Sequence, residues 1–315
     1  MTPLHLVVLA AGKGTRMKSR LPKVLHSAAG LPLIEHVLRT AGRMSPASIV
    51  IVVGHRADDV RAALQSRSDI KFALQEPQLG TGHALLQTEA ALAGASGTVI
   101  LLSGDVPLLR AETLQRLVDR HRGTGAAATV LTAIAPDPTG YGRIERHGDR
   151  VTGIVEDKDA SPAQRAIREI NSGIYAFDIA PLFGALRQIG SANAQREYYL
   201  PDLVRIYHDR GLGVETVTLD DPEEILGVNS RRELAQVAQS LRRIRNEELM
   251  DSGVTIVDPA TAYIGPDVTI GPDTIIHPNV HLEGRSSIGE GCEIQCGVRD
   301  GGLGGALPVV GHSVA

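Results

Sequence analysis

Aliphatic residues recur at every sixth position near the end of this sequence. The spacing holds without a slip at Ile264, Ile270, Ile276, Leu282, Ile288 and Ile294. Glycine follows three of them, at Gly265, Gly271 and Gly289. A hexapeptide repeat of this kind is typical of a parallel β-helix, in which each aliphatic side chain points inward and each coil covers the next. The repeat therefore predicts a short solenoid within residues 251–299.

The sixfold pattern stops before the sequence does. The next position in register is Asp300, and residues 300–315 are rich in glycine without any repeat. A segment of this composition cannot extend the stack, so we expect residues 300–315 to form a disordered tail. A truncation or a change of reading frame near Cys296 would explain such an ending.

The sequence before the repeat alternates between two patterns. Short β-type runs occupy Leu4–Leu9, Ile49–Val53, Val99–Leu102, Thr129–Ala133 and Gly173–Phe177. Stretches with apolar residues at helical spacing occupy Leu33–Gly42, Asp58–Ser66, Gly82–Leu92 and Ala111–Arg122. This alternation favours an α/β domain with a mostly parallel sheet over residues 1–229. Residues 230–250 have the spacing of a helix, which we expect to link that domain to the solenoid.

Length and composition limit the class of protein. The 315 residues suffice for one large or two ordinary domains, and 43% hydrophobic residues can fill their cores. No apolar run reaches about 18 residues and no signal sequence opens the chain, so we expect a cytoplasmic protein without stable membrane insertion. A net charge of −4 gives no overall basic surface, so nucleic acid is not an expected partner. Cys292 and Cys296 both come late and are assigned to ordinary packing.

The loop after the first predicted strand has the composition of an anion site. Residues Leu9 to His26 combine small residues with Lys13, Arg16 and Lys23. A loop at the carboxyl end of a parallel strand offers free backbone N–H groups to phosphate oxygens, and the three cations add positive charge. The loop lacks the third glycine of a dinucleotide fingerprint and the Lys-Ser/Thr of a Walker loop. The loop therefore indicates a nucleoside triphosphate site that is neither a dinucleotide fingerprint nor a Walker loop.

The same segment carries a family resemblance. Leu9-Ala-Ala-Gly-Lys-Gly-Thr-Arg-Met17 followed by Leu21-Pro-Lys-Val-Leu-His26 resembles the signature of the sugar-nucleotide pyrophosphorylases, and among them the bacterial N-acetylglucosamine-1-phosphate uridylyltransferases. The resemblance implies a Rossmann-like nucleotidyltransferase domain followed by a left-handed parallel β-helix. It also implies that Leu9, Ala10, Ala11 and Gly12 contact the substrates.

An aspartate follows the predicted strand Val99–Leu102. Asp105 stands at a glycine-softened strand end, where a carboxylate can hold a hard cation or simply make a turn or cap a helix. The resemblance favours the first reading and implies that Asp105 binds Mg²⁺ together with Asn229 of Gly227-Val-Asn229. It also implies substrate contacts for Ser103 and Gly104, although many relatives have Tyr where this chain has Ser103.

A second motif is Gln75-Glu-Pro-Gln-Leu-Gly-Thr-Gly-His83. By itself Gly-Thr-Gly reads as a turn that opens a helix. By resemblance, Gln75, Gly80 and Thr81 contact uracil and give the preference for UTP. His83 is assigned to capping or packing.

The third set of motifs lies between residues 140 and 202. By resemblance Gly142 contacts the sugar through its backbone, Glu156 accepts hydrogen bonds from sugar hydroxyls, and Asn171 binds the acetamido or hydroxyl groups. Solvated polar residues are ordinary in such strand-and-turn stretches, and only the order of the three along the chain supports the reading. The segment Glu197-Tyr-Tyr-Leu-Pro-Asp202 is assigned mainly to scaffolding.

The implied reaction is uridylyl transfer from UTP to N-acetyl-α-D-glucosamine 1-phosphate, which gives UDP-N-acetylglucosamine and pyrophosphate for peptidoglycan and lipopolysaccharide precursors. Because two anions must meet, charge neutralisation matters more than a protein nucleophile. We expect Arg16 and Lys23 to be the catalytic cations. The family is homotrimeric and also acetylates glucosamine 1-phosphate with acetyl-coenzyme A. We expect that second activity to be absent here, because its site lies in later coils.

Two other functions remain open. A related nucleotidyltransferase could make an ADP-, GDP- or dTDP-sugar, although Gln75 with Gly80 and Thr81 argues for uracil. Some translation-factor subunits join a similar domain to hexapeptide repeats and serve as binding or regulatory modules. The presence of Lys13, Arg16, Lys23, Asp105 and Asn229 together argues for catalysis.

Overall fold

The computed structural model describes residues 2–300, which form two compact units. The first contains residues 2–25 and 33–229, and the second contains residues 26–32 and 230–300. The 1–229 domain expected from the sequence included residues 26–32. These residues instead form a hairpin, β2 (Ser27–Ala28) and β3 (Leu31–Pro32), which packs with the helix that opens the second unit. The expected tail lies outside the described residues except for Asp300.

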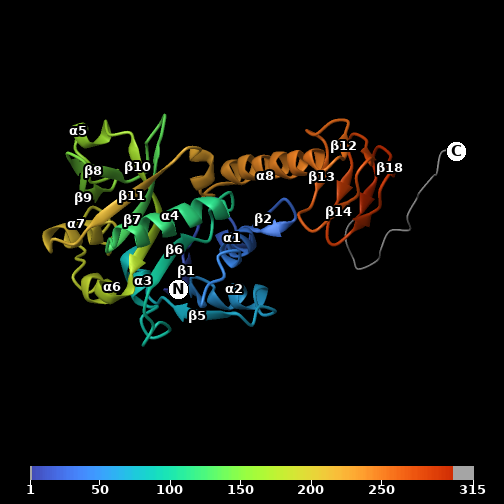
Figure 1. The fold of residues 1–315 in the computed structure, drawn as a ribbon. Coiled ribbons are helices and arrows are strands. Elements are labelled where there is room, and N and C mark those ends of the chain that lie inside the picture. Colours follow the sequence, from blue (N-terminus) through green and yellow to red (C-terminus); the bar gives the residue numbers. More distant parts are fainter. Residues whose placement is uncertain (1, 301–315) are drawn as a thin grey trace. The chain divides into compact units, whose positions relative to one another are not determined.

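A mixed sheet forms the centre of the first unit (Figure 1). Its main strands run in the order β11-β7-β10-β6-β1-β4-β5. They are β1 (Leu4–Ala10), β4 (Ser48–Val53), β5 (Ile70–Leu74), β6 (Thr98–Ser103), β7 (Ala128–Ile134), β10 (Glu169–Asp178) and β11 (Val214–Leu219). β1 pairs in parallel with both β4 and β6, so the loops after these strands emerge at one edge. The mostly parallel α/β fold is confirmed.

Helices cover both faces of this sheet because its central strands are apolar on both sides. Side chains such as Leu6 and Val8 face α1 (Leu33–Gly42), α2 (Ala57–Ala63) and α4 (Ala111–Thr124) in one core. Val7 and its counterparts face α3 (Thr81–Leu86), α6 (Ile179–Leu186) and α7 (Asp202–Asp209) in the other. The sheet is thereby held as a rigid layer between two cores.

β10 breaks the parallel order. It pairs antiparallel with both β6 and β7, and its register shifts between Asn171 and Tyr175. A hairpin of β8 (Arg143–His147) and β9 (Arg150–Val155) joins its beginning through a pair between Ile170 and Arg143. The short helix α5 (Pro162–Arg165) follows, with a capping box at Ser161. This hairpin carries the expected sugar-side residues.

One expected helix is shorter than its pattern. The sequence favours a helix over Gly82–Leu92, but α3 ends at Leu86 and turns follow. The Thr88 hydroxyl donates a hydrogen bond to the Leu85 carbonyl at 2.7 Å. A side chain that binds nearby backbone in this way competes with the helix ladder.

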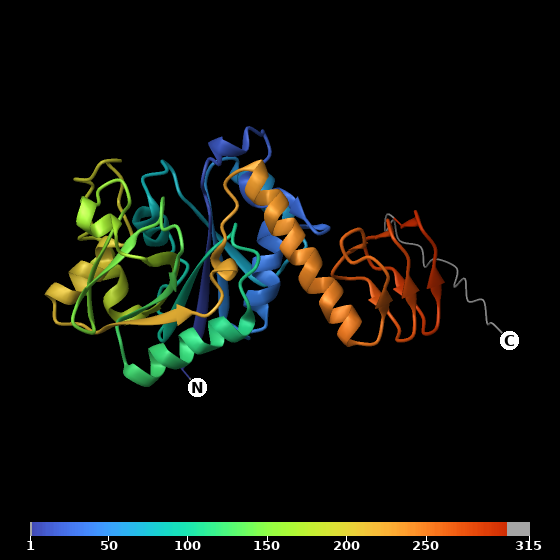
Figure 2. The same ribbon diagram turned by 90° about the horizontal axis from the view of Figure 1, so that it is seen from above.

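The second unit begins with α8 (Arg231–Asp251), which is capped by the Ser230 hydroxyl and matches the expected linker helix. From Tyr263 onward, short parallel strands stack at intervals of eighteen residues, as the pairs Ile264 with Leu282 and Ile276 with Ile294 show (Figure 2). These strands are β12 (Thr255–Ile256), β13 (Tyr263–Ile264), β14 (Thr269–Ile270), β15 (Ile275–Ile276), β16 (His281–Leu282), β17 (Ser287–Ile288), β18 (Glu293–Ile294) and β19 (Arg299–Asp300). The hexapeptide β-helix is confirmed.

The stack reaches one position further than the repeat suggests. Asp300 pairs with Leu282 in β19, and the Ser286 hydroxyl hydrogen-bonds to its carboxylate. The aspartate thus takes the position of an inward aliphatic and finds a polar partner there. Residues 2–300 contain no helix that is both long and apolar enough to cross a membrane.

Candidate active site

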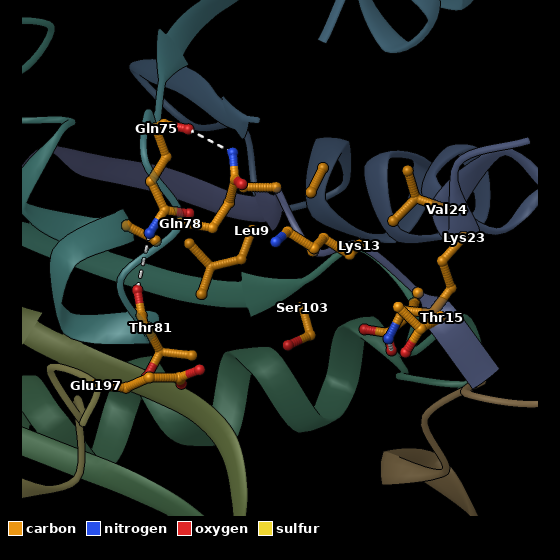
Figure 3. A pocket seen from close by; sticks show the side chains of 17 residues that line it. Leu9, Lys13, Thr15, Lys23, Val24, Gln75, Gln78, Thr81, Ser103 and Glu197 are labelled. Carbon is orange, nitrogen blue, oxygen red and sulfur yellow. Dashed lines mark hydrogen bonds and ion pairs between the residues drawn. The ribbon is translucent and has the colours of Figure 1, made fainter. Parts of the chain in front are cut away.

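A pocket of about 490 Å³ opens at the carboxyl ends of β1, β5 and β6 in the first unit (Figure 3). Its lining includes most of the residues expected on the nucleotide side, namely Leu9, Ala10, Ala11, Gly12, Lys23, Gln75, Gly80, Thr81, Ser103 and Asp105. Gln75 and Thr81 lie towards one end in Figure 3, and Lys23 and Thr15 towards the other, with Lys13 between them. Ligands of open α/β sheets bind at this edge. The pocket has room for an elongated, charged molecule.

The glycine loop bends so that it can pack against Lys23. Gly14 has a left-handed φ of 57°, and a Cβ there would lie 2.8 Å from the Cβ of Lys23. Any larger residue would therefore displace the lysine stem. Lys13 and Thr15 line the pocket, whereas Arg16 is exposed on the short 3-10 helix η1 (Thr15–Met17) and is not in the lining. Lys23 therefore lies in the pocket, whereas Arg16 lies outside it on the exposed loop that follows β1.

Lys23, Asp105 and Asn229 meet at one point. The Lys23 ammonium donates to Asp105 Oδ2 and, at 3.0 Å, to Asn229 Oδ1. The Val228 N–H donates to the Asp105 carbonyl at 3.0 Å, which ties the two loops together. A cation thus already sits between two oxygens contributed by residues far apart in the sequence. Carboxylate and amide oxygens are ligands that Mg²⁺ accepts when substrate phosphates and water complete its shell.

No group of three or more His, Cys, Asp or Glu side chains suited to a metal occurs within residues 2–300. Asp105 and Asn229 contribute one carboxylate oxygen and one amide oxygen to the point where Lys23 lies.

The opposite end of the pocket is built around a tight turn. Gly80 has φ 109°, and a Cβ there would lie 2.7 Å from the Tyr198 carbonyl oxygen. The Tyr198 carbonyl accepts from the Gly82 N–H at 2.8 Å, and Thr81 Oγ1 accepts from the Leu200 N–H at 3.1 Å. The segment 197–200 thus holds the turn in place, which is the scaffolding expected of it. Glu197 also lines the pocket.

Ser103 and Gly104 end β6. Ser103 lines the pocket, while Gly104 donates its N–H to the Leu9 carbonyl at 2.9 Å and lies outside the lining. A Cβ at Gly104 would be 3.1 Å from that carbonyl oxygen. Gly104 therefore holds the ends of β1 and β6 together.

A second cluster joins the three residues expected on the sugar side. The Asn171 N–H donates to the Gly142 carbonyl at 2.9 Å. A Cβ on Gly142 would lie 3.4 Å from both the Asn171 Cβ and Glu156 Oε1. Burial raises the pKa of Glu156, and the carboxylates of Asp159, Asp202 and Asp157 add to this effect, while Arg143 partly offsets it. These residues do not line the pocket around Lys23.

Arg143 steadies the loop that carries Glu156. Its side chain is only 2% exposed and donates to Asp157 Oδ1 at 2.9 Å and to the Tyr141 carbonyl. Asp157 follows Glu156 in the sequence and by itself would add negative charge to the sugar side. The structure shows that this charge is paired with a buried guanidinium.

The sequence did not assign Gln78 or Glu197 to the pocket. Gln78 lines it and donates to the Gln75 carbonyl at 2.9 Å, and Glu197 contributes a carboxylate. His83 lies behind Gln75 and contacts its amide. The position of His83 two residues after the Gly80-Thr81 turn was the only sign in the sequence that it could lie near the site. Its contact with Gln75 becomes evident only in the fold.

Comparison with known families identifies both parts of the chain. Residues 6–163 match the model of the MobA-like NTP transferase domain. The chain belongs to this family. Residues 267–299 match the bacterial transferase hexapeptide model, which describes six repeats.

Similar proteins share both parts. The chain is 52% identical over 299 residues to the bifunctional protein GlmU of Syntrophotalea carbinolica. The aligned residues cover 94% of this chain and 64% of that protein. It is 50% identical over 298 residues to the bifunctional protein GlmU of Geobacter metallireducens, covering 94% and 63% of the two chains. The resemblance drawn from Leu9–His26 is confirmed. The chain spans less than two thirds of the length of these relatives.

A solved structure shares the fold. A putative glucose-1-phosphate thymidylyltransferase from Bacillus anthracis, crystallised with sucrose, superposes with a TM-score of 0.60 at 19% identity and covers 76% of this chain and 94% of its own. At this identity the likeness concerns the fold alone. Membership of the nucleotidyltransferase family is consistent with a divalent metal requirement.

Proposed function

We propose that this chain transfers the uridylyl group of UTP to N-acetyl-α-D-glucosamine 1-phosphate and releases pyrophosphate. The observation that carries the proposal is one pocket with Gln75 at one end and Lys23 beside Asp105 and Asn229 at the other. A nucleoside triphosphate needs a polar group that contacts its base at one end of the pocket and a cation that contacts its phosphates at the other end. The similarity to GlmU proteins at about half of all positions supports the choice of substrates.

The reaction joins two anions. A phosphate oxygen of the sugar 1-phosphate attacks the α-phosphorus of UTP, one P–O bond forms, and the bond to the β-phosphate oxygen breaks as pyrophosphate leaves. Lys23 and Arg16 would offset the negative charge on the phosphates, and the N–H groups of the loop after β1 would hold the triphosphate. No protein nucleophile is required, because orientation and charge neutralisation supply the main effects.

Asp105 and Asn229 would hold Mg²⁺. When bound, this ion neutralises phosphate charge and holds the reacting groups together. The Lys23 ammonium occupies the point between the two oxygens, so Lys23 would move to the phosphates when the metal takes its place.

The sugar would bind at Gly142, Glu156 and Asn171. A carboxylate and an amide beside the Gly142 backbone suit neutral hydroxyl and acetamido groups better than phosphate, because the acids around Glu156 repel anions. The cytoplasmic location expected from the sequence belongs to the same proposal.

The test is pyrophosphate release by the purified chain with UTP, N-acetylglucosamine 1-phosphate and Mg²⁺, beside ATP, GTP and dTTP. Release with UTP alone supports the proposal. Release with dTTP and glucose 1-phosphate would assign a different sugar nucleotide, and silence with every nucleotide would favour a binding module. Acetyl-coenzyme A with glucosamine 1-phosphate forms a separate assay for the second family activity, which we expect to be absent.

A further inference from the structure

The amide of Gln75 is buried and held in one orientation. Gln75 follows β5 and is 3% exposed. Its Nε2 donates to the Gly80 carbonyl at 2.9 Å. A carbonyl oxygen can only accept, so the nitrogen and not the oxygen of the amide must face Gly80.

His83 provides a second anchor for the same nitrogen. Its Nδ1 lies 3.2 Å from Gln75 Nε2. Since the amide nitrogen can only donate, Nδ1 must accept, and the ring must be neutral with its proton on Nε2. Burial lowers the pKa of His83, which favours this neutral form. Both protons of the Gln75 amide are then engaged, and its oxygen is the group left to present.

The far side of the ring makes this orientation depend on Gln87. Gln87 Nε2 lies 3.1 Å from His83 Nε2 and 3.2 Å from the His83 carbonyl. Two amide nitrogens cannot both donate to one neutral imidazole, so one glutamine must turn its oxygen to the ring. If the Gln87 amide turns, it loses only its hydrogen bond to the His83 carbonyl. Turning Gln75 would set a buried amide oxygen against the Gly80 carbonyl oxygen, which is far less favourable.

We propose that His83 is a positioning residue for base selection, which fixes the Gln75 amide so that its oxygen accepts the N3–H of uracil. This inference rests on the proposed function. Cytosine carries a lone pair at N3 and would meet the Gln75 oxygen as a second acceptor. The selection of UTP over CTP therefore depends on a residue that does not line the pocket.

The test is the ratio of dissociation constants for UTP and CTP, measured by calorimetry with Mg²⁺ on the full chain. His83→Ala removes one of the two anchors, and we expect the ratio to fall roughly 3- to 10-fold, as for one hydrogen bond. His83→Asn places an accepting oxygen near the position of Nδ1 and should restore most of the preference. His121→Ala is the matched control, because His121 is another imidazole with a lowered pKa but lies buried in the core, where it hydrogen-bonds Thr129 Oγ1 at 3.1 Å.

The outcomes separate the two proposals. If the unmodified chain binds neither UTP nor CTP, the proposed function fails. If it prefers UTP and His83→Ala keeps the same ratio, the role of His83 is wrong. A loss of both affinities in equal measure in His83→Ala, as a general loss of structure would give, also overturns it, whereas a lower ratio rescued by His83→Asn supports it.

Discussion

Two clusters in the first unit carry opposite charge. The segment Leu9–His26 has five Lys and Arg residues and no carboxylate. On the sugar side, Glu156 lies near Asp157, Asp159 and Asp202, and its pKa is raised. The first region concentrates cations around a glycine loop, and the second concentrates acids around a partly buried carboxylate. An extended phosphate chain is therefore favoured in the first region and disfavoured in the second, so charge alone can orient a two-part substrate.

The two regions also differ in how their polar groups are satisfied. Lys23 is matched by Asp105 and Asn229 in the described structure, and the charge of Asp157 is matched by Arg143. Glu156, in contrast, is destabilised in its charged form by its surroundings. A group held in an unfavourable state is a common mark of a functional site. Changes on the cationic side should therefore cost mainly turnover, and changes at Glu156 should trade sugar binding against stability.

The largest effect is expected from Lys23→Met. Loss of this cation should lower turnover roughly 10²- to 10³-fold, because a group aimed at transition-state charge is removed. The same change removes the ammonium that competes with a metal ion for the oxygens of Asp105 and Asn229, so binding of Mn²⁺ without nucleotide should tighten on the order of tenfold. Electron paramagnetic resonance of Mn²⁺ would measure this.

Lys13→Met is the matched control for Lys23, since Lys13 lines the same pocket. It should weaken nucleotide binding without tightening Mn²⁺ binding. Unchanged Mn²⁺ affinity in Lys23→Met would contradict the exchange of lysine for metal.

Arg16→Ala tests the exposed edge of the cationic region. We expect a fall in turnover of roughly 10²-fold, at the lower end of what one charge-stabilising group supplies, because Arg16 is exposed and outside the pocket lining. Arg20→Ala, four residues further along the same segment, should have little effect. Steady-state pyrophosphate release measures both, and normal turnover by Arg16→Ala would remove Arg16 from the catalytic set.

Glu156→Gln tests the acidic region. The neutral amide is a weaker acceptor for sugar hydroxyls, so KM for N-acetylglucosamine 1-phosphate should rise roughly 10-fold or more, as for a hydrogen bond to a charged group. KM for UTP should stay the same. Asp149→Asn, which removes an exposed acid between β8 and β9, is the control. Equal changes in both KM values would mean that Glu156 supports the fold of the whole site rather than the sugar.

Sequence patterns predicted these regions unevenly. The apolar run Leu4–Leu9 identified β1, and the six-residue period identified the β-helix. Both patterns are clear because many of their positions are apolar and pack into one core. The hairpin β8–β9 was missed, because Arg143-Ile-Glu-Arg-His147 has too few apolar residues to read as a strand. The antiparallel direction of β10 depends on its pairing with β6 and β7, which the sequence of β10 alone does not indicate.

Site residues were predictable where a motif holds them and not where the fold assembles them. Asp105 could be singled out because it follows a predicted strand, and Gln75 because its motif resembles that of the family. The pairing of Lys23 with Asn229 joins positions 206 residues apart, and the contact of His83 with Gln75 depends on a turn held by Tyr198. The hairpin 26–32 was assigned to the wrong unit for the same reason, since His26 Nδ1 lies 3.2 Å from Arg231 Nη1 across a long stretch of sequence.

The smallest effect concerns stability at Glu156. Because the folded-state pKa of Glu156 lies above its ordinary value, the folded protein binds more protons there, and stability falls as pH rises from the unfolded pKa through the folded one. Glutamine has no such cost. Glu156→Gln should therefore raise the melting temperature of the ligand-free chain at neutral pH by on the order of 2 °C. The gain should vanish below about pH 4, where the carboxyl is protonated in both states. Differential scanning calorimetry at both pH values decides it, and a lower melting temperature for Glu156→Gln at neutral pH would mean that the charged carboxylate stabilises the sugar side.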